Sequence, residues 1–107
     1  MLKTFQHTLN EPVYFKGIGL HTGKIAKLKV VPGKDDQGII FKRTDLSEKN
    51  LISAKYKNVS SAKLCTTLEN EYGTKVSTVE HLLAALYISD IDNATIEIDN
   101  EEVPIMD

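Results

Sequence analysis

Apolar and polar residues alternate over several short stretches of this 107-residue chain, which is the pattern of strands with one buried face. The clearest stretch covers residues 24–31, where Ile25, Leu28 and Val30 alternate with lysines. A second clean alternation covers residues 94–98. We predict strands over residues 13–19, 24–31, 38–41, 62–68 and 94–98, a weaker strand over 4–9, and a return hairpin over 103–106.

One segment near the three-quarter point predicts a helix instead, over residues 78–88. Ser77 and Glu80 have the S-x-x-E spacing of a capping box, and an apolar run follows them. Helical spacing places a set of larger apolar residues on one face, which we expect to pack on the sheet: Val79, Leu82, Leu83, Leu86 and Tyr87. The opposite face holds His81, Ala84, Ala85 and Ile88. Since that face is uncharged, we expect a partner domain or subunit to cover it.

Together these elements predict an α+β fold, a two-layer sandwich of one mainly antiparallel sheet and one long helix. The length predicts a single domain with a modest hydrophobic core. Residues 44–58 are polar and follow neither period, so we interpret them as a small irregular insert.

The composition excludes several classes of partner. Thirteen basic and 15 acidic side chains are interleaved and give a formal net charge of −2, so we expect no binding to nucleic acid. The longest apolar run, residues 82–88, is far shorter than the roughly 20 residues that span a bilayer, and the N-terminus resembles no export signal. The single cysteine, Cys65, excludes an internal disulfide framework, so we expect a cytoplasmic protein.

The clearest candidate chemistry lies at the start of the predicted helix, in Glu80 and His81. The positive end of a helix dipole keeps a carboxylate ionised and an imidazole neutral, which suits a general base beside a metal ligand. A simpler interpretation is that Glu80 completes the capping box and His81 is a partly buried neighbour. The spacing alone favours the simpler interpretation, because position 85 is alanine and the zinc motif H-E-x-x-H is absent.

The remaining potential zinc ligands are His7, His21 and Cys65. Catalytic zinc sites use about three protein ligands. His21 lies in residues 19–23, G-L-H-T-G, whose glycines fit either a ligand that approaches backbone amides or a plain turn. Cys65 in an apolar strand is more typical of a buried small residue than of a nucleophile. One alternative groups His7, His21 and His81 in a single metal site.

Several motifs occur together and in a fixed order: G-I-G-L-H-T-G-K at 17–24, R-T-D-L at 43–46, L-C-T at 64–66, S-T-V-E-H-L at 77–82, I-D-N at 91–93 and V-P-I-M-D at 103–107. In this combination the chain resembles UDP-3-O-acyl-N-acetylglucosamine deacetylase, the zinc amidase at the committed step of lipid A synthesis in Gram-negative bacteria. The resemblance covers nearly the whole chain but only the N-terminal domain of that family. It favours the catalytic interpretation of Glu80 and His81 over the simpler one.

The resemblance implies roles for individual residues. Glu80 is expected to be the general base that activates water, and His81 is expected to bind Zn²⁺. The residues expected to contact the UDP-sugar acyl substrate are Leu64, Cys65, Thr66 and, with a less definite role, His21. Asp107 is expected near the catalytic region without being a ligand. The remaining zinc ligands and the general acid are expected from a C-terminal domain of the same enzyme, so the 107 residues alone are expected to be inactive.

We therefore interpret residues 1–107 as an incomplete N-terminal domain of a zinc-dependent deacetylase. The alternative is a non-catalytic α+β interaction domain that docks a partner through the helix 78–88. Substitutions in the full-length protein discriminate between them. In the enzyme, Glu80→Ala should keep the metal and lose rate, and His81→Ala should lose the metal, whereas a scaffold would show neither effect.

Overall fold

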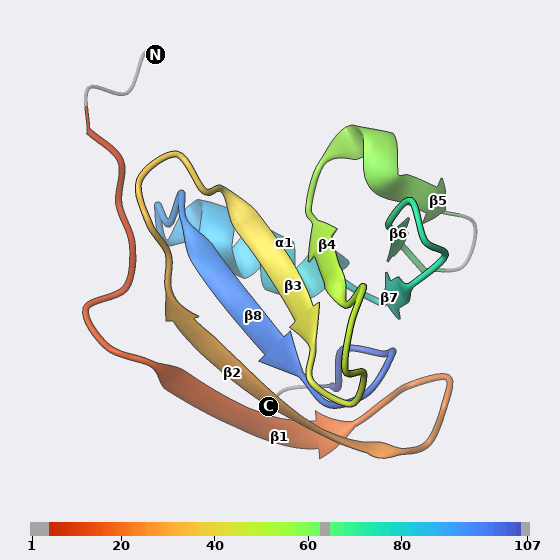
Figure 1. The fold of residues 1–107 in the computed structure, drawn as a ribbon. Helices are drawn as coiled ribbons and strands as arrows, with labels where there is room; N and C mark the ends of the chain where they lie inside the picture. The colour runs from red at the N-terminus through yellow and green to blue at the C-terminus, as the bar shows by residue number, and fades with distance from the viewer. Residues whose placement is uncertain (1–4, 63–64, 106–107) are drawn as a thin grey trace.

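The computed structural model describes residues 5–62 and 65–105, and this part of the chain forms two sheets and one α-helix (Figure 1). The five-stranded sheet has the order β1 (Val13–Ile18), β2 (Ile25–Pro32), β8 (Ala94–Ile98), β3 (Ile39–Arg43) and β4 (Leu51–Ser53). The three-stranded sheet has the order β5 (Val59–Ser61), β6 (Thr67–Glu69) and β7 (Lys75–Ser77). The helix α1 (Glu80–Ile88) lies between β7 and β8 in the chain, and a 3-10 turn, η1 (Tyr56–Asn58), precedes β5.

The larger sheet is antiparallel except where β3 runs parallel to β8. β8 is its central strand, and Ala94, Ile96 and Ile98 are buried while the two residues between them are half-buried. The predicted strand over 94–98 is therefore confirmed. Its alternating pattern arises because every second side chain of the strand points into the core.

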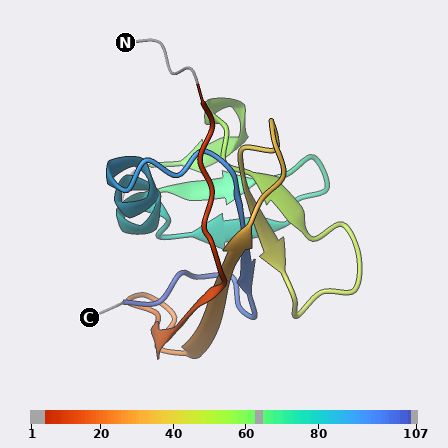
Figure 2. The ribbon, with the colours of Figure 1, turned by 90° about the vertical axis from the view of Figure 1, so that its left-hand side faces the viewer.

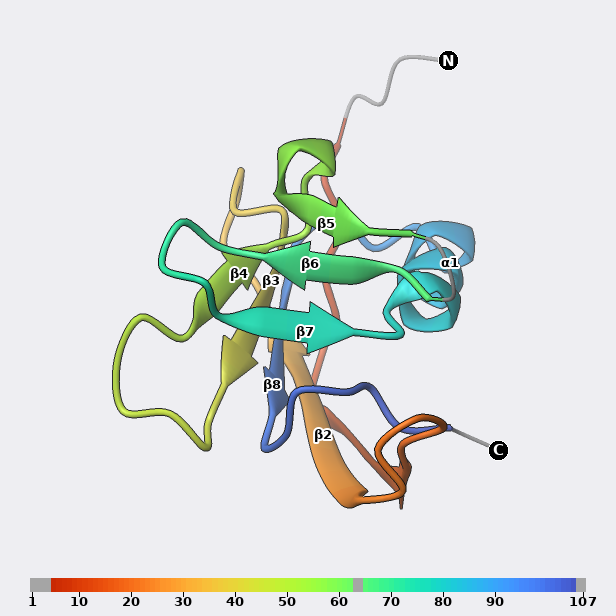
Figure 3. The same cartoon turned by 90° about the vertical axis from the view of Figure 1, so that its right-hand side faces the viewer.

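The second layer consists of α1 together with the smaller sheet. α1 lies behind the larger sheet in Figure 1 and to one side of it in Figure 2. Figure 3 shows the smaller sheet running across the strands of the larger one. The core side chains come from both sheets, the helix, the residue before the helix and the segment after β8: Leu28, Val30, Phe41, Ile52, Leu68, Val76, Val79, Leu82, Leu86, Ala94, Ile96, Ile98 and Val103. The α+β class with mostly antiparallel strands is thus confirmed, with a second small sheet added to the predicted helix layer.

The predicted strand over 24–31 is confirmed as β2, with one correction to its buried face. Ala26, Leu28 and Val30 are buried, whereas Ile25 is 60 % exposed. Ile25 comes one residue before Ala26, and successive side chains of a strand point to opposite faces, so Ile25 lies on the face opposite the buried residues. This position explains the irregular step in the alternation.

Two predicted strands and the predicted irregular insert need correction. Residues 5–9 form no strand; instead, the His7 carbonyl accepts the backbone N–H groups of Asp92 and Asn93 at 2.9 and 3.2 Å. Of the described residues in 62–68, namely 62 and 65–68, strand pairing begins at Thr67. The range 44–58 is not wholly irregular, since it contains β4 and η1.

The predicted hairpin at 103–106 is wrong for the residues that the structure describes. The Val103 N–H donates to the Ser77 carbonyl and the Ile105 N–H to the Ile18 carbonyl, each at 3.0 Å. The segment after β8 therefore crosses to β7 and β1 instead of pairing back on β8. No local sequence pattern distinguishes these partners, because they are distant in the chain.

The helix begins at Glu80, two residues later than predicted, and the capping box is absent. Ser77 belongs to β7, and its hydroxyl donates to the Glu101 carbonyl at 3.4 Å. Thr78 turns the chain with a φ of 61°. Leu82 and Leu86 are buried as predicted, but Tyr87 is 85 % exposed and does not pack on the sheet. Within the described residues, no helix has the length and apolar character needed to cross a membrane.

Candidate functional site

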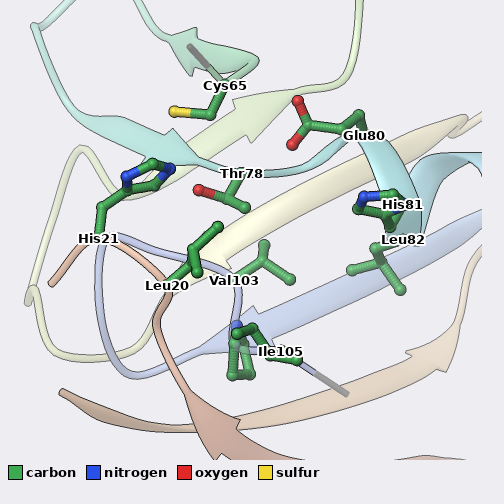
Figure 4. Close-up of a pocket in the computed structure, with 10 residues that line it drawn as sticks. Leu20, His21, Cys65, Thr78, Glu80, His81, Leu82, Val103 and Ile105 are labelled. Carbon is green, nitrogen blue, oxygen red and sulfur yellow. The ribbon is translucent and has the colours of Figure 1, made fainter. Parts of the chain in front are cut away.

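A cavity of about 540 Å³ lies where the start of α1 faces the loop between β1 and β2 (Figure 4). Four segments of the chain contribute to its wall: the β1–β2 loop, Cys65 two residues before β6, the β7–α1 junction and the segment after β8. The lining residues are Leu20, His21, Cys65, Thr78, Glu80, His81, Leu82, Val103, Pro104 and Ile105. Both members of the predicted reactive pair, Glu80 and His81, therefore belong to one cavity.

Glu80 is the first residue of α1, and its two carboxylate oxygens have different surroundings. Oε2 accepts the backbone N–H of Thr66 at 2.7 Å. Oε1 is buried and has no hydrogen-bond partner in the part of the chain that the structure describes. A buried polar atom left unpaired destabilises a protein by about 1–3 kcal/mol, so this oxygen is suited to a further partner such as a water molecule or a proton.

The surroundings of Glu80 also fix its charge. Burial raises the pKa of this carboxyl group, but hydrogen bonds, chiefly from the Thr66 backbone N–H, and the neighbouring His81 outweigh burial and hold the pKa below its ordinary value. Glu80 is therefore ionised at neutral pH. An ionised carboxylate with one unpaired oxygen can accept a proton.

His81 follows Glu80 on the first turn of α1, and its side chain is exposed at the cavity. Figure 4 shows the Glu80–His81 pair on one side of the cavity and His21 on the other. An accessible imidazole can give one nitrogen to a metal ion. Among the described residues, no group of three or more His, Cys, Asp and Glu side chains could hold a metal, so His81 fits zinc chemically but does not complete a site.

The alternative that joins His7, His21 and His81 in one metal site is wrong for the described residues. The His7 N–H donates to Asp92 Oδ2 at 2.7 Å, and His7 Nδ1 lies 3.1 Å from Asp90 Oδ2, beyond the C-terminal end of α1. His81 lies at the N-terminal end of the same helix. The helix therefore separates the two imidazoles.

The residues predicted to contact substrate divide into three groups. His21 and Cys65 line the cavity. Thr66 does not line it but contributes its backbone N–H to Glu80. Leu64, like Asp107, lies outside the described residues.

Sequence reasoning missed Glu102, which is only 1 % exposed. Its Oε1 accepts the backbone N–H of Thr22 at 2.8 Å, and both oxygens lie 3.1 Å from the N–H of His21. Oε2 accepts the hydroxyl of Thr78 at 2.7 Å. Burial raises the pKa of Glu102, but the Thr78 hydroxyl and the two backbone N–H groups hold the pKa below its ordinary value.

These contacts bear on the two interpretations of the 19–23 loop, which are the approach of a ligand to backbone amides and a plain turn. Gly19 does allow a carboxylate to approach backbone amides, but the carboxylate belongs to Glu102 of the same chain. The sequence gives no signal for this, since Glu101 and Glu102 are adjacent glutamates and only the fold buries the second.

The fold and the cavity define an α+β domain that presents a proton acceptor and one potential metal ligand from the first turn of a single helix. The family model for UDP-3-O-acyl N-acetylglycosamine deacetylase matches residues 6–107. The chain belongs to this family, as the motifs of the sequence predict.

Curated relatives agree with the family match. A protein of Phenylobacterium zucineum (strain HLK1) named UDP-3-O-acyl-N-acetylglucosamine deacetylase is 45 % identical over 104 residues, which are 96 % of this chain and 36 % of the relative. Proteins of the same name from Shewanella loihica and Shewanella baltica (strain OS155) are 47 % and 46 % identical over 103 residues, which are 96 % of this chain and 34 % of each relative. The chain thus spans about a third of the length of the curated relatives it matches.

Proposed function

We propose that residues 1–107 form the N-terminal part of a zinc-dependent amidase that removes the acetyl group from UDP-3-O-acyl-N-acetylglucosamine, in the cytoplasmic biosynthesis of lipid A by a Gram-negative bacterium. The observation that carries this proposal is the joint placement of Glu80 and His81 on one cavity, in a chain of the deacetylase family. The names of the relatives supply the substrate and the reaction. Since the chain spans about a third of them, the complete reaction requires the rest of the protein.

His81 is the zinc ligand that this segment contributes. Its imidazole is accessible at the cavity, on the first turn of α1, and a neutral imidazole nitrogen can bind a metal ion. The other ligands come from the remaining two thirds of the protein. Zinc, when bound, supplies a Lewis acid that polarises the substrate carbonyl and makes water easier to deprotonate.

Glu80 is the general base. The Thr66 N–H holds Oε2, which leaves Oε1 to accept a proton from the water that attacks the acetyl carbonyl. The C–N bond of the amide then breaks, and the products are acetate and a free amine on the sugar. The proton for that amine comes from a group outside this segment.

The exposed face of α1 supports a contact between this segment and the rest of the enzyme. Ile88 is 82 % exposed, and Ala84 and Ala85 beside it are also exposed. We place the C-terminal domain of the enzyme on this face, because small side chains allow close approach of another backbone. A non-catalytic docking module would use the same face, so activity has to decide between the two functions.

The test uses the full-length protein that carries this segment, assayed for acetate release and for bound zinc. Glu80→Gln keeps an oxygen for the Thr66 N–H but removes the base, so zinc should stay while kcat falls by about 10²–10⁴-fold. His81→Ala should lose zinc. Glu101→Gln, an exposed neighbour of the cavity segment, is the matched control and should resemble the unaltered protein.

The segment of 107 residues alone should release no acetate. Turnover by this segment, or a Glu80→Gln protein as active as the control, would contradict the proposed roles. Full-length protein that neither binds zinc nor deacetylates would support the docking module instead.

A further inference from the structure

Glu102 joins the two sides of the cavity through hydrogen bonds to both. On one side it binds the backbone of His21 and Thr22, in the loop that carries the His21 imidazole. On the other side it binds the Thr78 hydroxyl, two residues before Glu80. Both partner segments line the cavity, whereas the Glu102 side chain itself lies behind its wall.

Thr78 determines how the chain enters α1. Its φ of 61° is in the left-handed region, which is unfavourable for a β-branched residue and persists only where surrounding contacts enforce it. The hydroxyl bond to Glu102 is one such contact. The neighbouring Ser77 is fixed as well, because its N–H donates to the Glu101 carbonyl at 2.7 Å and its carbonyl accepts the Val103 N–H at 3.0 Å. The turn that directs Glu80 into the cavity is therefore held by the segment after β8, which contains Glu102.

The loop on the other side is shaped to fit the same carboxylate. A Cβ at Gly19 would lie 2.4 Å from Glu102 Oε1, so the loop approaches the carboxylate as closely as a glycine allows. The loop is closed by its own hydrogen bonds from the Gly19 N–H to the Lys24 carbonyl and from the Gly23 N–H to the Gly19 carbonyl, at 2.9 and 3.0 Å. Because the backbone of His21 is held in place, the position from which its imidazole side chain extends is held as well.

We propose that Glu102 is a positioning residue of the active site, which holds His21 and the Thr78 turn in a fixed relation across the cavity. This inference rests on the proposed function, since it assigns Glu102 an effect on the reaction through His21 and Glu80. Glu102 touches no reacting group itself. A role in folding alone would lower stability and leave the kinetics of the folded enzyme unchanged.

The experiment compares Glu102→Gln with Glu101→Gln in the full-length enzyme. Glutamine keeps the shape but replaces one acceptor oxygen by a donor amide, which conflicts with the N–H and O–H groups around it. We expect Glu102→Gln to lower kcat/KM about tenfold or more with the zinc content unchanged, and Glu101→Gln to stay within about twofold. Unchanged kcat and KM in folded Glu102→Gln would overturn the positioning role.

Thr78 gives a second, independent comparison if Glu102→Gln does not fold. Thr78→Ser keeps the hydroxyl and should keep most activity, whereas Thr78→Val removes it and should lose about as much as Glu102→Gln. The double variant Thr78→Val with Glu102→Gln should be little worse than Glu102→Gln, because both changes remove the same bond. Equal activity of the serine and valine variants, or fully additive losses in the double variant, would overturn the inference.

Failure of the proposed function looks different, because the unaltered full-length protein would then release no acetate. In that case hydrogen exchange of the His21 and Thr22 amides decides about Glu102. Faster exchange of both amides in Glu102→Gln than in Glu101→Gln supports positioning of the loop, and equal exchange overturns it.

Discussion

Replacing Gly19 by alanine tests whether space or backbone freedom explains this glycine. A Cβ at Gly19 would lie 2.4 Å from Glu102 Oε1 and 2.5 Å from Thr22 Oγ1, which is closer than side-chain atoms tolerate. The Glu102 carboxylate would have to move away from the loop. Gly23, at the other end of the same loop, has a φ of 68° and no atom within 4 Å of a Cβ, so alanine there meets only backbone strain.

The expected magnitudes follow from these two situations. Moving the Glu102 carboxylate breaks its bonds with the N–H groups of His21 and Thr22, and hydrogen bonds to charged groups each contribute about 1.5–3 kcal/mol. Gly19→Ala should therefore lower the free energy of unfolding by about 3 kcal/mol or more. Gly23→Ala should lower it by about 1–2 kcal/mol, the ordinary effect of a Cβ in the left-handed region.

Urea denaturation of the 107-residue chain, followed by far-UV circular dichroism, measures both variants. With a slope of about 2 kcal/mol per molar urea for a small domain, the midpoint should fall by about 1.5 M for Gly19→Ala and about 0.5–1 M for Gly23→Ala. Backbone reasoning alone predicts the opposite order, since Gly23 has a positive φ and Gly19 does not. A Gly19→Ala chain as stable as the unaltered one would refute the contact between Glu102 and the loop.

Two further predictions concern the core and the response to acid. Leu82 is 3 % exposed, so Leu82→Ala should lower the free energy of unfolding by about 2–5 kcal/mol in the same denaturation assay. Ile88→Ala, at a residue 82 % exposed, should change it by no more than about 0.5 kcal/mol, and similar losses would show that α1 packs by another face. The pKa of Glu102 is held below its ordinary value of 4.5, so the stability it contributes is complete above that pH and disappears as pH falls through the lowered pKa. Denaturation over a pH series should therefore show a smaller acid loss for Glu102→Gln than for Glu101→Gln, and equal losses would contradict the buried contacts.

The sequence predicted best those elements that one local pattern decides. β8 and the burial of Leu82 and Leu86 in α1 follow directly from their periods, although Tyr87 on the same predicted face is exposed. The capping box failed although its spacing was correct. The N–H and the hydroxyl of Ser77 donate to the Glu101 carbonyl, and the Glu80 carboxylate accepts the Thr66 N–H. Partners distant in the chain therefore replace the local hydrogen bonds of the capping box.

The candidate site shows the same division. Glu80 and His81 were predicted from the family resemblance of their motif, since their spacing alone favoured a capping role, and the structure brings them to one cavity with His21 and Cys65. Glu102 could not be found in this way. Its partner His21 lies 81 residues away in the chain, and no spacing rule connects two such positions.

Two features at the start of α1 are each unfavourable alone, and each stabilises the other. A β-branched residue with positive φ is strained, and a buried carboxylate is costly unless donors surround it. The Thr78 hydroxyl gives Glu102 a donor, and Glu102 gives Thr78 a contact that holds its conformation. An apolar residue at position 102 would leave the Thr78 hydroxyl and the His21 and Thr22 amides without this acceptor. The pairing of Thr78 with Glu102 is therefore explained by hydrogen bonding and not by burial of apolar surface. Under the proposed function, such mutual support beside Glu80 and His81 would preorganise the site, because it would keep the shape of the cavity wall fixed before a substrate binds.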